Sequence, residues 1–229
     1  GEFEERLKSV IKEVTNANIF FDFNGTIIND VDLCLNILNE MLKENGLEPI
    51  TLERYREIFT FPIKKYYEAA GFDFKKKTFE ALSDDFIKLY QKASLECPLY
   101  DNVRESLLKL KNNGYRLVCL SASQIDNLTE QLVHFNIAQY FDAILGISNI
   151  YAASKVEIGK KYLEEHKINP IDAIMIGDTL HDKEVCDSMG IKCVLFDKGH
   201  QSHRVLESAG VQIISSYNEF FKFVGDYYA

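Results

Sequence analysis

Apolar runs of strand length alternate with amphipathic helical segments along the second half of the chain. The apolar runs after residue 98 are YRLVCLS, FDAILGIS, DAIMIGD, KCVLFD and VQIIS. Segments with helical periodicity separate them, such as NVRESLLKLKNNG and SKVEIGKKYLEEHKI. Strands without a polar face, joined by amphipathic helices, are typical of a parallel sheet that is covered on both sides. The pattern therefore predicts an α/β protein with a doubly wound parallel sheet.

The first predicted strand, NIFFDF, is separated from this series by a long helical stretch. Between residue 30 and about residue 95 every periodic segment is helical, as in DVDLCLNILNEMLKENG and TFEALSDDFIKLYQKASLE. We therefore expect a core formed by residues 17–30 and 96–229, with an inserted all-helical cap over residues 31–95. Residues 1–16 are expected to form an N-terminal extension that is helical.

Composition and charge narrow the class of function. The chain has 229 residues, 46% of them hydrophobic, and a net charge of −9. An acidic chain without a basic stripe argues against nucleic acid as a partner. No apolar run approaches the length of a membrane span, and the start GEFEERLKSV shows no signal-peptide pattern. The scattered cysteines are typical of reduced thiols. These features predict a cytoplasmic protein.

Polar and charged residues follow the predicted strands. Asp22 ends the first strand, Ser121 ends the second, and Lys155 follows the third after a loop. The fourth strand ends at Asp178, and Asp182 lies one helical turn later. Ligands of open parallel sheets bind at the carboxyl ends of the strands. We therefore expect these five side chains to converge on one rim of the sheet.

Each of these residue types has a task in phosphoryl transfer. A carboxylate can attack phosphorus and form an aspartyl-phosphate. Mg²⁺ prefers oxygen ligands, usually one or two carboxylates together with phosphate and water. A lysine and a serine hydroxyl can hold the phosphate oxygens. Gly25 allows a sharp turn after Asp22, so that nearby amides can point at the phosphate.

The ordered set DFNGT, Ser121, Lys155 and GDTLHD resembles the haloacid dehalogenase superfamily of phosphohydrolases. The resemblance covers nearly all of residues 17–215, and the helical insertion resembles the cap of its phosphoglycolate-phosphatase-like branch. It implies a Rossmann-like core. It also implies that Asp22 is the nucleophile and a metal ligand, with Asp178 as a second ligand.

The same resemblance assigns the remaining roles. Asn24 would offer its backbone carbonyl to Mg²⁺, and Asp182 would bind the metal through water or orient its ligands. Ser121 and Lys155 would bind phosphate, and Lys155 would also neutralise the nucleophile.

Further substrate contacts are expected beside these residues. Gly25, Thr26 and Ala122 flank the motif residues at the strand ends. Lys64 lies early in the helical insertion, in the segment TFPIKKYY, and is expected to reach the substrate from above.

Asn24 departs from the family pattern. Phosphatases of this superfamily carry aspartate there, which protonates the leaving oxygen and then activates water. An amide keeps the shape but exchanges no proton at neutral pH, and loss of such a group costs about 10²- to 10⁴-fold in rate. The sequence is therefore compatible with a slow phosphatase, limited to leaving groups that need little protonation, or with one that recruits another acid.

This departure leaves other functions open. Phosphonate hydrolases of the superfamily use a cap lysine that forms a Schiff base, for which Lys64 or Lys65 is available. A catalytically weak protein that only binds a phosphate ligand is another alternative. Dehalogenases of the superfamily dispense with Mg²⁺, and the intact Asp178 argues against that reaction.

Some of these residues also have purely structural explanations. Asp182 and Asp30 are each placed to cap a following helix. Ser121 is compatible with an ordinary turn, and Lys155 with a solvated first helical turn. His181 is expected to start a helix, and His200 has no partner that the sequence identifies.

The sequence thus predicts a Mg²⁺-dependent phosphatase that acts on a small phosphorylated metabolite through Asp22. A cap that closes over the site would exclude bulk water and select the substrate. Neither the identity of that substrate nor the oligomeric state follows from the sequence.

Overall fold

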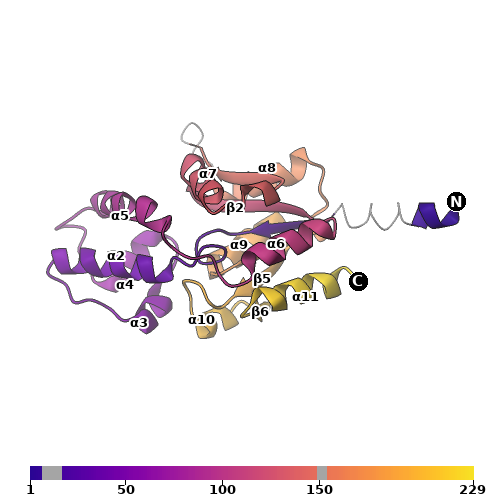
Figure 1. Cartoon of the computed structure of the whole chain (residues 1–229). Coiled ribbons are helices and arrows are strands. Elements are labelled where there is room, and N and C mark those ends of the chain that lie inside the picture. The colour runs from indigo at the N-terminus through magenta and orange to yellow at the C-terminus, as the bar shows by residue number, and fades with distance from the viewer. Residues whose placement is uncertain (7–16, 149–153) are drawn as a thin grey trace.

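A six-stranded parallel sheet forms the centre of the larger part of the molecule (Figure 1). The structure is a computed structural model that describes residues 1–6, 17–148 and 154–229. The strand order is β3-β2-β1-β4-β5-β6, and each neighbouring pair is parallel. The strands are β1 (Asn18–Phe21), β2 (Arg116–Gln124), β3 (Ala143–Ile147), β4 (Ala173–Gly177), β5 (Lys192–Phe196) and β6 (Gln212–Ile214). The predicted doubly wound α/β fold is confirmed.

Helices cover both faces of this sheet. Their bounds are α6 (Val103–Asn112), α7 (Ile125–His134), α8 (Lys155–Glu165), α9 (Leu180–Met189), α10 (His203–Glu207) and α11 (Tyr217–Tyr227), with short 3-10 turns η1 (Ala138–Tyr140) and η2 (Pro170–Asp172). Apolar residues of α6, α7 and α11 share one buried cluster with the sheet, and those of α8, α9 and α10 share the other. Strands buried on both faces explain the continuously apolar runs in the sequence.

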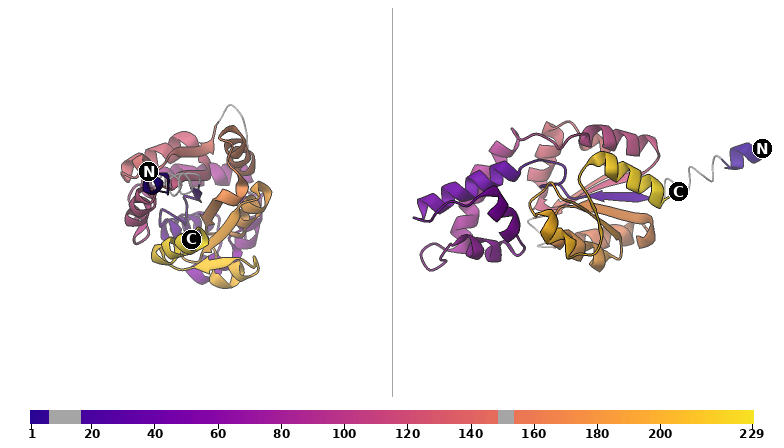
Figure 2. Two further views of the ribbon diagram at one scale, coloured as in Figure 1. Left: turned by 90° about the vertical axis from the view of Figure 1, so that its right-hand side faces the viewer. Right: turned by 90° about the horizontal axis from the view of Figure 1, so that it is seen from below.

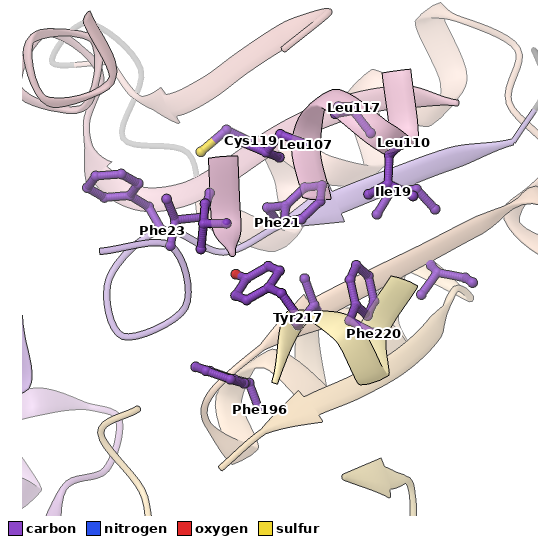
Figure 3. Packing of buried hydrophobic residues seen from close by; sticks show 14 of the residues in the cluster. Ile19, Phe21, Phe23, Leu107, Leu110, Leu117, Cys119, Phe196, Tyr217 and Phe220 are labelled. Atoms are coloured by element: carbon purple, nitrogen blue, oxygen red, sulfur yellow. The ribbon is translucent and has the colours of Figure 1, made fainter. Parts of the chain in front are cut away.

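The central strand β1 has large side chains that fill both layers. Phe20 packs in the cluster beneath α8 and α9, whereas Phe21 faces α6 and α11. Figure 3 shows Phe21 close to Leu107 and Phe220, and the rings of Phe21 and Phe220 meet edge to face. Fully burying such a side chain stabilises the fold by about 1.5–3 kcal/mol. This packing fixes the position of the residue that follows β1, Asp22.

Four helices between β1 and α6 form a separate group, which lies at the carboxyl ends of the strands (Figures 1 and 2). They are α2 (Val31–Glu44), α3 (Leu52–Ile58), α4 (Ile63–Ala70) and α5 (Phe79–Ser94). These helices bury an apolar cluster of their own. We call residues 31–94 the helical module. The domain boundaries given above stay a prediction.

The structure adds three details to the predicted elements. Strand β2 continues to Gln124, beyond the predicted end at Ser121. Helix α11 had no counterpart among the predicted elements. At the N-terminus residues 2–6 are helical, and the rest of the predicted helical extension, residues 7–16, lies outside the described residues. Within the described ranges, each helix is too short or too polar to cross a membrane, and the five cysteines are free thiols.

Candidate active site

Two aspartates meet at the point where the strand order reverses. Strands β1 and β4 are neighbours, with Phe21 opposite Ile176, so Asp22 and Asp178 emerge from the sheet close together. Asp182, in the first turn of α9, completes a group whose carboxylate oxygens lie within 4.8 Å of one another. The predicted convergence of these three residues is therefore present in the structure. A switch point of this kind is the usual ligand site of doubly wound sheets.

Lys155 joins two of these carboxylates. It is the first residue of α8, and its Nζ donates to Asp22 Oδ1 at 3.0 Å and to Asp182 Oδ1 at 2.9 Å. Only 5% of its side chain is exposed. A capping box formed by Ser154 and Glu157 starts the helix at this point. Lys155 is thus a buried site residue, and the alternative of a solvated lysine does not hold.

Asp182 has both a structural and a site role. Its Oδ2 accepts hydrogen bonds from the backbone N–H of Asp178 and of Thr179, at 3.0 and 3.1 Å, and from the Thr179 hydroxyl at 3.1 Å. These bonds form the capping box that starts α9. Its other oxygen, Oδ1, is the one bound by Lys155. Asp182 therefore does cap α9 through Oδ2, and this orientation leaves Oδ1 facing Lys155.

The loop after β1 and the backbone N–H of His200 both hold the Asp178 carboxylate. The Thr26 hydroxyl donates to Asp178 Oδ1 at 3.2 Å, and the His200 backbone N–H donates to Oδ2 at 2.8 Å. Gly25 adopts a positive φ of 71°, and a Cβ there would lie 2.2 Å from Asp178 Oδ2. Only glycine leaves the space that this carboxylate occupies. Thr26 is fully buried, so its hydroxyl supports Asp178 and does not face the pocket.

Burial and mutual repulsion perturb the acidic residues. Burial, together with the nearby charge of Asp182, raises the pKa of Asp22 above its usual value. Burial and the charges of Asp22 and Asp182 raise the pKa of Asp178 well above its usual range. For Asp182 burial acts in the same direction, but the Lys155 ammonium prevails and lowers the pKa. The site has more negative charge than Lys155 neutralises, which favours a cation.

Ser123 of β2 connects Ser121 to Asn24. The Ser121 hydroxyl accepts the Ser123 backbone N–H at 3.1 Å and donates to Ser123 Oγ at 2.9 Å. Ser123 Oγ in turn donates to Asn24 Oδ1 at 3.2 Å. Ala122 lies between them and also lines the pocket. Ser123 follows the second predicted strand, but the sequence indicates no role for it, because its bond to Asn24 joins positions 99 residues apart.

Asn24 is held by an acid that the sequence analysis treated only as a candidate helix cap. Asp30 makes no capping bond to α2. Its Oδ2 accepts hydrogen bonds from Asn24 Nδ2 at 3.1 Å and from the Tyr90 hydroxyl at 2.6 Å. Its Oδ1 accepts from the Gly25 backbone N–H at 3.0 Å and lies 2.9 Å from His200 Nε2. Burial opposes ionisation of Asp30, but the bonds from His200, Tyr90 and Asn24 prevail and lower its pKa.

This network brings together residues that lie far apart in the chain. His200 also meets the Tyr55 hydroxyl through Nδ1 at 2.7 Å, so both of its ring nitrogens have partners. Tyr90 and Tyr55 belong to the helical module, whereas His200 follows β5. No sequence signal pairs these residues, because their spacing along the chain is arbitrary.

A cavity of about 450 Å³ lies between these polar residues and the helical module. Its floor is formed by Asp22, Asn24, Ser121, Lys155 and Asp178. Its walls are mainly aromatic, and the residues involved are Tyr55, Phe59, Phe61, Tyr66, Tyr67, Phe79, Phe86 and Tyr90. The arrangement fits a ligand with a polar end on the sheet and an apolar body under the helices.

Lys64 does not join this group. It is exposed on α4, with its Nζ 5.3 Å from the centre of the Phe74 ring, and does not line the cavity. Lys65 is likewise exposed and outside the lining. Lys64 therefore lies outside the cavity lining, because α4 turns Tyr66 and Tyr67 to the cavity. The contact of Lys64 with substrate stays a prediction. His181 does lie at the rim, with its ring stacked on Phe61 at 4.7 Å.

Comparison with known proteins agrees with this geometry. The family model for haloacid dehalogenase-like hydrolases matches residues 19–196, which include each motif residue discussed above. The chain belongs to this family. The family resemblance and the expected enzyme class, a hydrolase of this type, are thereby confirmed.

Curated relatives and a solved structure are similar over most of the chain. A phosphoglycolate phosphatase from Caulobacter vibrioides is 25% identical over 90% of this chain and 89% of its own length. One from Aquifex aeolicus is 26% identical, covering 77% of this chain and 83% of that protein. The crystal structure of a predicted phosphatase from Clostridium acetobutylicum superposes with a TM-score of 0.78 at 25% identity, covering 92% of this chain and 98% of the other. These family members agree with the expected phosphohydrolase branch.

Proposed function

We propose that this protein is a Mg²⁺-dependent phosphatase of a small phosphorylated metabolite, with Asp22 as its nucleophile. The observation that carries the proposal is the position of Asp22. Its carboxylate ends the central strand, lies at the floor of the cavity and is bound by the buried Lys155. A carboxylate fixed in this way beside two further acids is suited to attack a bound phosphoryl group.

The three acids fit a magnesium ion. Asp22, Asp178 and Asp182 offer carboxylate oxygens within 4.8 Å of one another. Burial first, and mutual repulsion second, raise the pKa values of Asp22 and Asp178, and a cation would relieve that repulsion. Asp22 and Asp178 would hold the ion directly, together with the Asn24 backbone carbonyl. Asp182 already binds Lys155 and three N–H or O–H groups, which suits it to an orienting role. When bound, Mg²⁺ would neutralise phosphate oxygens.

The reaction proceeds by two displacements. An Asp22 carboxylate oxygen bonds to phosphorus, and the ester P–O bond breaks with its electron pair leaving on the alcohol oxygen, which takes a proton from solvent water. Lys155 and the Ser121 hydroxyl are placed to bind the phosphoryl oxygens. Water then bonds to phosphorus, the bond from Asp22 to phosphorus breaks, and the proton of the water passes to solvent. Inorganic phosphate and the alcohol are the products.

Asn24 limits the proton transfers in both steps. Its Nδ2 is engaged by Asp30 and Tyr90, and its Oδ1 by Ser123. An amide in this position orients neighbours but neither gives nor takes a proton at neutral pH. Turnover is therefore expected to be slow when the leaving oxygen requires protonation.

The helical module is proposed to act as the cap of this site. Its residues Arg56 and Tyr90 already bond to the core, through the Gly199 carbonyl and Asp30 respectively. A closed module would exclude bulk water from the aspartyl-phosphate and would set the choice of substrate.

The test is Mg²⁺-dependent release of phosphate from acetyl phosphate and a panel of phosphate esters. Asp22→Asn is expected to abolish release, and the native protein to form an acid-stable phosphorylated species at Asp22. Asp187→Asn is the matched control, since this exposed aspartate of α9 pairs only with Lys183 among the described contacts. If Asp22→Asn retains activity, Asp22 is not the nucleophile. If the native protein binds phosphate and Mg²⁺ without turnover, the alternative of a phosphate-binding protein replaces the proposal.

A further inference from the structure

The described residues of the cavity lining offer no unengaged lysine or arginine for a negatively charged leaving group. Among the described residues that line the cavity, four are aspartates, Lys155 is the single lysine, and arginine is absent. Lys155 is already bound to Asp22 and Asp182. A leaving group with its own carboxylate, such as the glycolate of phosphoglycolate, would therefore meet acids and aromatic rings without a counter-ion. Burying an unpaired carboxylate there carries a large energetic cost.

The two histidines of the lining do not supply the missing charge. Both ring nitrogens of His200 are occupied, one by Asp30 and the other by Tyr55. His181 stacks on Phe61, and its Nδ1 lies 3.4 Å from the Glu184 carboxylate, which offsets any positive charge on the ring.

Two groups of stacked aromatic rings in the helical module line the cavity. Phe86 and Tyr90 stack on each other along α5, at 5.5 Å and an interplanar angle of 15°. Phe59 and Phe61 lie between α3 and α4 and extend this surface over the rings of His200 and His181. At the cavity rim Phe61 is 37% exposed and Ile87 57% exposed. Large apolar side chains exposed at a cavity mouth are typical of a surface that an apolar ligand covers.

The amide at position 24 points to the same ligand for a different reason. Without a proton donor at position 24, the reaction favours a leaving oxygen that is stable as an anion. A phenol, with a pKa of about 10, leaves far more readily unprotonated than an aliphatic alcohol. An aromatic leaving group would therefore pack against the aromatic walls of the cavity and would leave without a proton from position 24.

We propose that the substrate is a phosphate monoester of an uncharged, phenol-type aromatic alcohol, with its ring between α5 and the α3–α4 segment. This inference rests on the proposed phosphatase function and specifies its substrate class. The bond broken is the P–O bond of an aryl phosphate. Its electron pair leaves as phenoxide, which takes a proton from water after release.

The first test compares kcat/KM for phenyl phosphate, phosphoglycolate, glycerol 1-phosphate and acetyl phosphate. We expect phenyl phosphate to exceed both aliphatic esters by about tenfold or more, the lower range for burying one aromatic side chain. Phe86→Ala is expected to raise KM for phenyl phosphate by a similar factor and to raise KM for acetyl phosphate, which has no ring, much less. Leu89→Ala is the matched control, since Leu89 is an exposed residue of α5 outside the cavity lining.

The outcomes separate the two proposals. If phosphoglycolate is the better ester, or if Phe86→Ala affects acetyl phosphate and phenyl phosphate equally, the aromatic substrate class is wrong while the phosphatase function stands. If acetyl phosphate and the esters are all inert, the phosphatase function fails. Calorimetric titration of the Mg²⁺-loaded protein with phenylphosphonate and phosphonoacetate then decides the ligand class, because neither requires turnover. Tighter binding of phosphonoacetate would overturn the inference.

Discussion

At the scale of single residues, Asn24 is matched to its surroundings. Its Nδ2 donates to Asp30 Oδ2 at 3.1 Å, and its Oδ1 accepts from Ser123. An amide carries a donor and an acceptor in these two positions, whereas an ionised carboxylate has no donor for Asp30. Both ends of the Asn24 amide are therefore hydrogen-bonded to neighbouring site residues.

We predict that Asn24→Asp destabilises the protein, by about 1–3 kcal/mol, because it sets two buried carboxylates at hydrogen-bond distance. The pKa of the new aspartate would be raised by Asp30, so the loss should grow as pH rises above its usual pKa. Urea unfolding at pH 5 and pH 8 measures the difference. Adding Asp30→Asn should recover part of the loss at pH 8. Equal stability of Asn24→Asp and the native protein at pH 8 would contradict this account.

At the scale of elements, the turn between β1 and α2 connects the sheet to the helical module. Gly25 and Thr26 contact Asp178 from this turn, and the Tyr217 hydroxyl of α11 donates to the Thr26 carbonyl. Helix α11 thereby supports the loop after β1, although it lies outside the residues matched by the family model. The position of Asp178 relative to Asp22 depends on this turn.

We predict that Gly25→Ala reduces both stability and Mg²⁺ affinity, because its Cβ would lie 2.2 Å from Asp178 Oδ2. Gly210→Ala is the matched control: Gly210 also has a positive φ, of 65°, but a Cβ there meets nothing within 4 Å. Both variants share the backbone strain of about 1 kcal/mol. Isothermal titration with Mg²⁺ should show at least a tenfold weaker Kd for Gly25→Ala alone. Equal effects of the two substitutions would show that backbone strain accounts for both.

At the scale of the whole molecule, stability and metal binding are linked. The pKa values of Asp22 and Asp178 are raised in the folded protein. Their contribution to stability is therefore present below their usual pKa of about 3.9 and is lost as pH rises through the raised values. The proposed Mg²⁺ would bind the ionised forms, so it should restore this loss at neutral pH.

We predict that Mg²⁺ raises the melting temperature more at pH 8 than at pH 5. At a concentration 100-fold above Kd the stabilisation is about 2.7 kcal/mol, or about 5–10 °C for a chain of this size. Scanning fluorimetry with and without Mg²⁺ at each pH measures it. In Asp178→Asn the shift should largely disappear, whereas the metal-free melting temperature should not fall. A Mg²⁺ shift that is unchanged by pH or by this substitution would show that the ion binds elsewhere.

The sequence by itself determined the sheet and the residues at its strand ends. Apolar periodicity is a local signal, and the order of Asp22, Ser121, Lys155 and Asp178 follows from the rule that parallel strands end at one edge. The family match confirms the resulting fold class and hydrolase class.

Tertiary structure decided what surrounds those residues. The bonds of Asp30 to Tyr90 and His200 link positions 60 and 170 residues apart, and no periodicity encodes such distances. Helix α4 is oriented so that Lys64 is exposed to solvent while Tyr66 and Tyr67 line the cavity. Such choices depend on how helices pack against one another, and an amphipathic pattern only shows which side of each helix is apolar.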